Sequence, residues 1–258
     1  GLQNGVEKMT KFMMSSLFVI MLILVVRATT LDGAIDGLKF YLLPDFGKMA
    51  ENGFKEAVFA AMGQSFFTLS VGIGALAIFG SYIGKERRLT GEAISITVLD
   101  TVVALVAGLI IFPSCFAFDV NPGQGPGLVF VTLPNVFREM SGGRIWGALF
   151  FLFMSFAAFS TIIAVFQNII QFARDMWGIS LKKSVLINGV LLILLAVPCV
   201  LGMTDWAGFS IGGKSIMDIE DFLVSNNLLP IGSLVYLLFC MTRYGWGWDN
   251  FIKEANTG

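Results

Sequence analysis

The sequence predicts an all-α polytopic membrane protein with a break in one central helix. Of the 258 residues, 56% are hydrophobic and 25 are Phe, and the mean hydropathy is +0.80, which is far too apolar for a soluble domain. Long apolar stretches alternate with polar connections along the whole chain. One stretch of bilayer-crossing length carries glycines near its middle, where a membrane helix can open if protein shelters it.

Six stretches of the sequence are long and apolar enough to cross a hydrocarbon core of about 30 Å. Together they predict one transmembrane domain that covers residues 1–258. The expected spans are residues 12–31, 57–84, 93–118, 145–173, 184–204 and 222–242. The two longer connections, residues 32–56 and 119–144, are expected outside the cell.

The apolar run of the first span, residues 12–26, lies between Lys11 and Arg27, whose long side chains can reach the membrane surface; residues 28–31 extend the span. The connection after it is polar and contains turn-forming pairs such as Pro44-Asp45. A structured loop with one short helix around residues 46–50 is therefore expected there. The second span is the stretch with the glycines, and the third contains a single acidic residue.

The second extracellular loop is interrupted by several Pro and Gly clusters, which exclude a membrane span. Apolar residues nevertheless recur in it at helical spacing, and they predict a loop helix that dips toward the protein. These residues are Val129, Phe130, Leu133 and Phe137. The last three spans carry no charge, Pro198 lies near the end of the fifth, and Pro230 is expected to bend the sixth.

The orientation of the chain follows from its basic residues. Six spans place both chain ends on the same side of the membrane. Basic residues crowd the short loops after the second and fourth spans, whereas the opposite loops are longer and more acidic; the basic residues are Lys85, Arg87, Arg88, Arg174, Lys182 and Lys183. The positive-inside rule therefore predicts that both ends are cytoplasmic.

The segment 63–74 in the second span is the clearest candidate for a binding site. Ser70, Gly72 and Gly74 lie near mid-span, and each glycine weakens a helix by about 1 kcal/mol. An opened helix there offers carbonyl groups to a cation and a half-helix amino end to an anion. Alternatively, the glycines only allow another helix to approach closely. A dinucleotide-binding motif is formally matched by residues 72–77, but it requires a preceding strand in a soluble βαβ unit.

Composition argues against several classes of function. The net charge of −1 lacks the excess of basic residues that is typical of proteins that bind nucleic acid. The sequence has no His, and no paired catalytic groups are expected to converge, so an intramembrane enzyme is disfavoured. Cys115, Cys199 and Cys240 are widely separated in apolar stretches and are expected to be packing residues. The chain starts at Gly1 with a polar segment, which we interpret as a cut within a longer polypeptide.

Two groups of oxygen-bearing residues could bind a hard cation such as sodium. Asp100 is the only acidic residue within an expected span, and Thr97 and Thr101 lie near it on one helix face. The alternative is an ion pair between Asp100 and a basic residue of another helix. Ser160 and Thr161 belong to a small, hydroxyl-rich patch in the fourth span, where a close helix contact with back-bonded hydroxyls is the alternative.

Four motifs resemble the neurotransmitter:sodium symporter family, and in particular its bacterial amino-acid transporters. Segment 63–74 resembles the sixth helix of that family, residues 43–46 its preceding loop, residues 127–134 its extracellular loop helix, and Gly142-Gly143 the end of that loop. The resemblance covers nearly all of the chain. It implies a partial leucine-transporter fold with inverted repeats, in which this chain supplies helices five to ten and its partners include the missing helices of the same transporter.

The resemblance also implies roles for individual residues. The first sodium site corresponds to Thr68 and Asp100, and the second to Ala157, Ser160 and Thr161. The substrate-binding positions are Phe67, Ser70, Ile73 and Val165. The gating positions are Gln64, Tyr82, Asp175 and Asp221. For Tyr82 and the two gating acids, the alternative is an interfacial tyrosine and ordinary solvated charges.

The resulting expectation is sodium-coupled symport of an amino acid across the cell membrane by alternating access. Sodium ions are the only expected cofactor, with no organic group, and the expected partners are the amino-acid substrate and the lipid bilayer. Asp100 stands where many members have a neutral asparagine, so a fixed carboxylate could replace a bound chloride beside sodium. The alternative function is a non-transporting membrane receptor or scaffold on the same helices.

Overall fold

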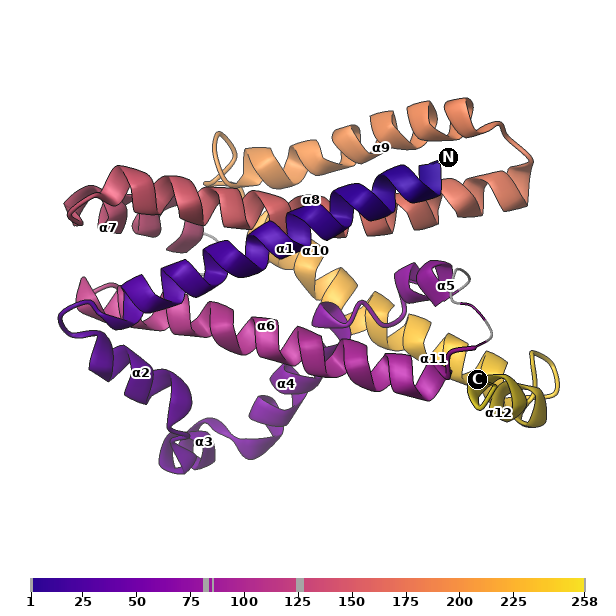
Figure 1. The fold of residues 1–258 in the computed structure, drawn as a ribbon, viewed down its shortest axis with the longest axis horizontal. Coiled ribbons are helices and arrows are strands. Elements are labelled where there is room, and N and C mark those ends of the chain that lie inside the picture. The colour runs from indigo at the N-terminus through magenta and orange to yellow at the C-terminus, as the bar shows by residue number, and fades with distance from the viewer. Residues whose placement is uncertain (1, 81–83, 85, 124–127, 258) are drawn as a thin grey trace. The chain divides into compact units, whose positions relative to one another are not determined.

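The computed structural model describes residues 2–80, 84, 86–123 and 128–257. Helices dominate these residues, and the described part of the chain contains no β-strand beyond a single bridge between Ile211 and Lys214. The helices follow one another along the chain as Figure 1 shows. They form two compact units, which are described separately below. The first unit comprises Gly1–Glu51 and Val98–Ile162, and the second comprises Asn52–Thr97 and Ile163–Gly258.

The first unit is built around a phenylalanine-rich core. Its elements are α1 (Leu2–Thr29), α2 (Ala34–Leu42), α3 (Phe46–Asn52), most of α6 (Leu89–Ala117), the π-helix η1 (Leu128–Thr132), α7 (Leu133–Glu139) and the first half of α8 (Gly143–Trp177). Met21 of α1, Leu133 of α7 and Phe150 of α8 are almost completely buried in the core. The rings of Phe137 and Phe150 lie 5.4 Å apart, so α7 and α8 pack directly on each other.

The expected loop helix after the third span is present as η1 followed by α7. Leu133 and Phe137 point into the core of the first unit, as the apolar stripe predicts. Val129 is half-buried, whereas Phe130 is 62% exposed and makes the stripe prediction wrong at that position. Gly127, where the family motif begins, lies outside the described residues.

The loop after the first span contains more helix than the sequence predicts. The short helix expected around residues 46–50 is α3, where Asp45 accepts a hydrogen bond from the Lys48 backbone N–H. That hydrogen bond lowers the pKa of Asp45. Helix α2 was not expected. It lies against α6, because a Cβ atom on Gly37 would overlap the backbone of residues 112–113. The ring of Tyr41 stacks on Phe112 at 4.7 Å.

The second unit contains the remaining helices. They are α4 (Phe54–Thr68), α5 (Ala75–Gly80), the start of α6, the second half of α8, α9 (Leu181–Gly202), α10 (Ile216–Leu223), the π-helix η2 (Val224–Leu228), α11 (Leu229–Met241) and α12 (Trp248–Ala255). Helix α4 contacts both η2 and α11. A reciprocal capping box between Ser215 and Asp218 starts α10. The irregularity expected at Pro230 lies slightly earlier, in η2, and Pro230 itself belongs to the first turn of α11.

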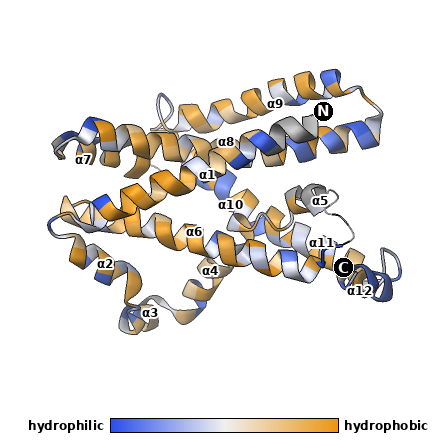
Figure 2. Ribbon diagram, in the orientation of Figure 1, coloured by the Kyte–Doolittle hydropathy of each residue, from blue (hydrophilic) through white to orange (hydrophobic). Residues whose placement is uncertain are grey.

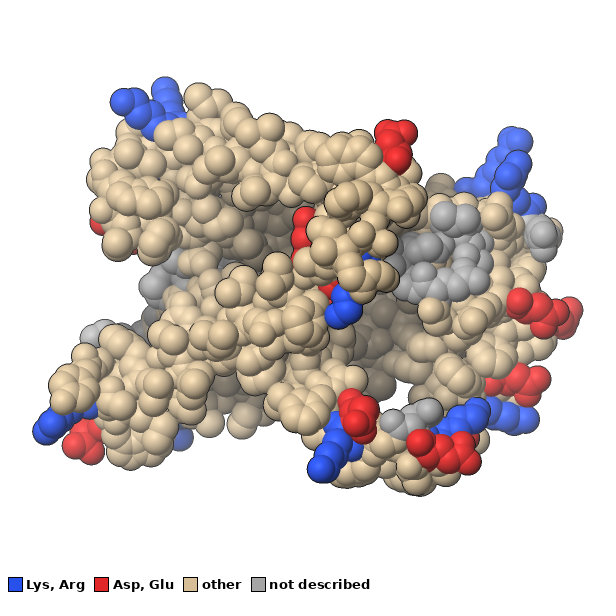
Figure 3. Space-filling view, turned by 180° about the vertical axis from the view of Figure 1, so that it is seen from behind, with Lys and Arg blue, Asp and Glu red and all other residues tan. Residues whose placement is uncertain are grey.

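Five helical segments among the described residues are long and apolar enough to cross a membrane. They are Lys8–Thr29, Leu89–Ala117, Gly143–Trp177, Leu181–Gly202 and Ile216–Met241. The second expected span, residues 57–84, is divided between α4 and α5, and neither helix reaches bilayer length. Figure 2 shows apolar residues along most of α1, α6 and α9. On the face drawn in Figure 3, small groups of charged side chains are separated by broad uncharged areas.

Candidate functional site

The central feature of the second unit is the interruption between α4 and α5. Helix α4 ends at Thr68, α5 begins at Ala75, and residues 69–74 between them are not helical. We call residues 69–74 the break. Ser70, Gly72 and Gly74 have positive φ angles of 50°, 93° and 84°, which L residues other than glycine rarely adopt. The prediction of a broken central helix is therefore confirmed at these positions.

The break begins with hydrogen bonds back to α4. The backbone N–H of Ser70 donates to the carbonyl of Phe67, and that of Val71 donates to the carbonyl of Phe66, both at 3.1 Å. The chain thus leaves α4 through a tight turn rather than through an unpaired end. Such pairing is required in a bilayer, where water cannot satisfy exposed backbone groups.

Helix α11 supports the break through direct backbone contact. A Cβ atom on Gly72 would collide with the Leu229 carbonyl and the Ser233 N–H, and a Cβ atom on Gly232 would lie 2.5 Å from the Gly72 carbonyl oxygen. No residue larger than glycine fits either position without movement of the backbone. The close helix approach is therefore present as well, but the alternative that the glycines only admit another helix is wrong, because they both open α4 and admit α11.

Helix α8 holds the other side of the break through Asn168. The side-chain Nδ2 of Asn168 donates a hydrogen bond of 2.8 Å to the carbonyl oxygen of Ile73. The Tyr236 hydroxyl of α11 lies close to the backbone of Gly74, 2.5 Å from where a Cβ atom would stand. Sequence reasoning missed Asn168. The available signal was an amide side chain within a charge-free span, where a polar group needs a partner.

The candidate substrate residues of the second unit surround this arrangement. Phe67 is 52% exposed at the end of α4, and Ser70 and Ile73 are half-buried in the break. Val165 lies on α8 slightly less than one turn before Asn168, whose side chain contacts Ile73. Ile73 and Val165, which are distant in sequence, are therefore brought to the same region. Gln64 and Thr68 lie on the last turns of α4 with exposed side chains.

The candidate residues of the second sodium site form one cluster on α8 in the first unit. The hydroxyls of Ser160 and Thr161 both donate to the carbonyl oxygen of Ala157, at 2.8 and 3.2 Å. This is the back-bonding that the packing alternative predicts. The same geometry places three oxygen atoms together, and a hydroxyl that donates its proton keeps its lone pairs for a cation. Ser160 is half-buried and Thr161 is exposed.

The two candidate residues of the first sodium site belong to different units. Thr68 ends α4 in the second unit, and Asp100 is half-buried on α6 in the first. The neighbouring Thr97 hydroxyl donates to the Ala93 carbonyl at 2.9 Å. Joint coordination of one ion by Thr68 and Asp100 therefore stays a prediction.

The candidate gating acids both accept hydrogen bonds from side chains on their own helix segment. Asp221 on α10 accepts from the buried Ser225 hydroxyl of η2 at 2.7 Å. Asp175 near the end of α8 accepts from the Gln171 amide at 2.8 Å, and Gln171 in turn accepts from Arg174. These bonds fix the direction of each carboxylate. Tyr82, the fourth candidate, lies outside the described residues.

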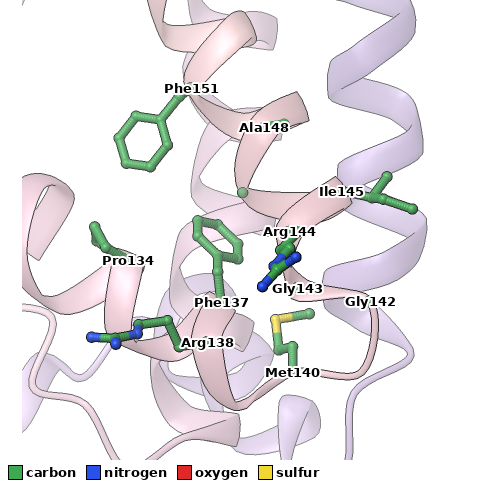
Figure 4. Close-up of a pocket in the computed structure, with 11 residues that line it drawn as sticks. Pro134, Phe137, Arg138, Met140, Gly142, Gly143, Arg144, Ile145, Ala148 and Phe151 are labelled. Atoms are coloured by element: carbon green, nitrogen blue, oxygen red, sulfur yellow. The ribbon is translucent and has the colours of Figure 1, made fainter.

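A pocket of the first unit is lined by none of the predicted site residues. It has a volume of about 770 Å³ and lies between α7 and the start of α8. Figure 4 shows its lining, in which the apolar side chains of Phe137 and Phe151 occur together with Arg138 and Arg144. The backbone of Gly143 approaches the Phe137 carbonyl more closely than a side chain would permit. The pocket therefore arises from the tight turn between the two helices.

Comparison with known proteins gives a consistent result. Residues 1–257 match the sequence profile of the Sodium:neurotransmitter symporter family. The uncharacterized sodium-dependent transporter YhdH of Bacillus subtilis (strain 168) is 36% identical over 239 residues, which are 93% of this chain and 52% of the relative. An uncharacterized sodium-dependent transporter of Haemophilus influenzae is 35% identical over 93% of this chain and 52% of the relative.

Similarity extends to a more distant relative and to a solved structure. The creatine transporter of Torpedo marmorata is 26% identical over 80% of this chain and 34% of the relative. The crystal structure of MhsT in complex with L-phenylalanine superimposes with a TM-score of 0.84 at 36% identity, over 96% of this chain and 55% of that chain.

The matching relatives are transporters rather than enzymes, and the chain spans about half the length of the two bacterial relatives. The profile match covers almost the whole chain, and the structural match includes a solved transporter with the same fold. The chain is thus a multi-pass membrane protein with a leucine-transporter-type fold, and it belongs to the Sodium:neurotransmitter symporter family.

Proposed function

We propose that this chain is part of a sodium-coupled amino-acid symporter of the cell membrane that works by alternating access. The observation that carries the proposal is the break between α4 and α5, which opens backbone groups in the middle of a predicted span and is held by α8 and α11. Discontinuous helices at mid-membrane depth form the substrate and ion sites of secondary transporters. Family membership supports sodium as the co-substrate.

The proposed ligands follow the oxygen chemistry of the candidate residues. Sodium is a hard cation that prefers carboxylate, hydroxyl and carbonyl oxygens. We assign Thr68 and Asp100 to a first sodium site, and the Ala157 carbonyl with the hydroxyls of Ser160 and Thr161 to a second. The Ala157 group is supported by the convergence of its three oxygens on one face of α8.

The proposed substrate site lies at the break. The side chains of Phe67, Ser70, Ile73 and Val165 contribute to it, and the half-helix amino end of α5 favours the carboxylate of an amino acid. The L-phenylalanine in the MhsT complex supports an amino acid as the substrate class. The creatine transporter among the relatives favours a substrate that also carries a carboxylate.

Alternating access would couple substrate movement to the sodium gradient. Each sodium charge that crosses 100 mV contributes about 2.3 kcal/mol, so two charges support a roughly thousandfold substrate gradient. In this mechanism Gln64, Tyr82, Asp175 and Asp221 contribute to gating. The six proposed spans, including the broken one, form one transmembrane domain with residues 1 and 258 on the cytoplasmic side.

Uptake by the full-length protein tests the proposal. Reconstituted vesicles are given radiolabelled amino acids, starting with L-phenylalanine, in sodium or in potassium buffer. Accumulation only with an inward sodium gradient is expected. Binding without accumulation would instead favour the alternative, a receptor or scaffold that does not transport.

A further inference from the structure

We propose that Asn168 is a positioning residue that fixes the backbone of the break and thereby orients the substrate-binding side chains next to it. The inference rests on the proposed function for its consequence, but its structural part concerns only the second unit. Asn168 is none of the candidate ligands described above. It acts through the Ile73 carbonyl, to which its amide donates at 2.8 Å across 95 residues of sequence.

The need for such a residue follows from the environment of the break. Because residues 69–74 leave the helix, their carbonyls lose the partners that a continuous helix would provide. An unsatisfied carbonyl in the hydrocarbon region costs several kcal/mol. The neutral amide of Asn168 is half-buried and supplies a donor to Ile73 without bringing a charge into the span. The hydrogen bond therefore favours the open form of the chain at Ile73 over other arrangements.

The position of the bond within the break explains why it can set side-chain orientation. The residue before Ile73 is Gly72, whose backbone touches α11 at Leu229 and Gly232. The residue after it is Gly74, with a φ angle of 84°, and glycine rotates freely between conformations. The backbone of α11 thus restrains the residue before Ile73, whereas α11 approaches the residue after it through the Tyr236 hydroxyl. The bond from Asn168 restrains the peptide group that follows Ile73, which glycine would otherwise leave free to rotate.

Two neighbouring candidate residues depend on this restraint. Ile73 carries the bonded carbonyl, so its side chain turns if the peptide turns. Val165 lies on α8 within one turn of Asn168, so the bond also fixes the distance between Val165 and Ile73. We expect loss of the Asn168 amide to loosen the break and to weaken substrate binding, while α8 itself stays intact.

Hydrogen exchange of the full-length protein in detergent tests the structural part without any ligand. In Asn168→Ala, amide exchange in peptides that cover residues 69–74 should accelerate about tenfold, as expected for loss of one buried hydrogen bond. The matched control is Asn188→Ala, because the Asn188 amide donates to Ser184, one turn earlier on its own helix α9. Unchanged exchange at residues 69–74 in Asn168→Ala would overturn the proposal, as would equal acceleration there in the control.

Asn168→Asp provides a second variant of nearly the same size. A protonated aspartic acid can donate its O–H to the Ile73 carbonyl, whereas an ionised carboxylate can only accept and repels that oxygen. The ratio of the exchange rate at residues 69–74 in Asn168→Asp to that in wild type at the same pH should therefore approach 1 as pH falls. The same ratio should rise as pH increases. Asn168→Ala should show no such trend. Because the Tyr236 hydroxyl lies beside the break, the series is repeated with Tyr236→Phe.

Binding of L-phenylalanine in sodium buffer tests the functional consequence. We expect about tenfold weaker binding in Asn168→Ala, and recovery of binding at low pH in Asn168→Asp. If wild type does not bind or transport amino acids, the proposed function fails while the exchange result still decides whether Asn168 holds the break. If wild type binds and the loosened Asn168→Ala variant binds equally well, Asn168 does not position the site and the inference is wrong.

Discussion

The break between α4 and α5 and the hydroxyl cluster on α8 present oxygen atoms in opposite ways. In the break, backbone groups leave the helix and are held by side chains and backbone of α8 and α11. In the cluster, α8 stays regular, and the hydroxyls of Ser160 and Thr161 bond to the Ala157 carbonyl of the same helix. The break depends on neighbouring helices, whereas the hydroxyl cluster is contained within the five residues 157–161 of α8.

This difference separates folding from function in the two regions. Substitutions at the break should disturb the packing of several helices, because its geometry depends on contacts with α8 and α11. Substitutions in the cluster should remove ligand oxygens and leave the helix intact, because an α-helix does not require those hydroxyls. The following predictions test this contrast, beginning with the largest expected effect.

Gly72→Ala should destabilise the full-length protein by at least about 2 kcal/mol. The new Cβ atom would overlap the Leu229 carbonyl, and the φ angle of 93° is unfavourable for alanine. Thermal unfolding in detergent measures the change. The control is Gly91→Ala on α6, where a Cβ atom meets nothing within 4 Å and stability should be equal or higher. Equal stability of the two variants would refute the backbone contact between the break and α11.

Thr161→Val should raise the sodium concentration needed for half-maximal substrate binding about tenfold or more. The melting temperature should stay nearly unchanged. Valine keeps the β-branched shape and removes one ligand oxygen. Titration of binding with sodium measures the effect. Ser155→Ala on the same helix is the matched control, since the Ser155 hydroxyl is also back-bonded, to Phe151 at 2.7 Å. If Thr161→Val gave the same sodium titration as wild type, the hydroxyl cluster on α8 would serve packing alone.

Asp100→Asn should make transport dependent on chloride, whereas wild type should be indifferent to it. The carboxylate supplies a permanent negative charge beside the proposed first sodium site, and the amide removes that charge. Substrate uptake is compared in chloride and in gluconate buffers. The Asp100→Asn variant should retain uptake in chloride and lose most of its uptake in gluconate. Asp119→Asn, an exposed acid just beyond α6, serves as the control. Chloride stimulation of the wild type would contradict the assignment.

Ser225→Ala should lower stability by only about 1 kcal/mol, which is typical of one buried hydrogen bond. The Ser225 hydroxyl donates to Asp221 within the α10–η2 segment, so the loss concerns one local contact. Ser65→Ala is the matched control, because the exposed Ser65 hydroxyl donates to the Met62 carbonyl of its own helix. If Ser225→Ala lowered stability as much as Gly72→Ala, then η2 would depend on contacts with neighbouring helices as strongly as the break does.

The sequence predicted the architecture and the position of the break because the signals are local. Gly72 and Gly74 weaken a helix wherever they occur, and the charge-free stretch around them has membrane-spanning length. The family motifs added the positions of the candidate ligands. Leu133 and Phe137 in the loop helix were also predicted correctly as buried, since helical periodicity alone selects them.

The features that the sequence did not predict depend on contacts between distant segments. Asn168 is one amide in a long apolar stretch, and nothing near it in sequence indicates Ile73 as its partner. Helix α2 follows a polar turn, where the sequence predicts a loop, because the stability of α2 comes from the close contact of Gly37 with α6. Phe130 fits the apolar stripe by spacing but lies in a π-helix, whose different periodicity changes the face on which it lies.

The π-helix η2 has a consequence for how sequences of this family should be aligned. In η2 the Leu229 N–H reaches back five residues to the Val224 carbonyl, so the turn contains one residue more than an α-helix needs. Each added residue corresponds to about 100° around an α-helix, so the residues of α11 are shifted by about that angle relative to the register of α10. A homologue with a regular α-helical turn at this place would therefore present a different residue in place of Gly232 to the break, and a gap-free alignment would conceal the exchange.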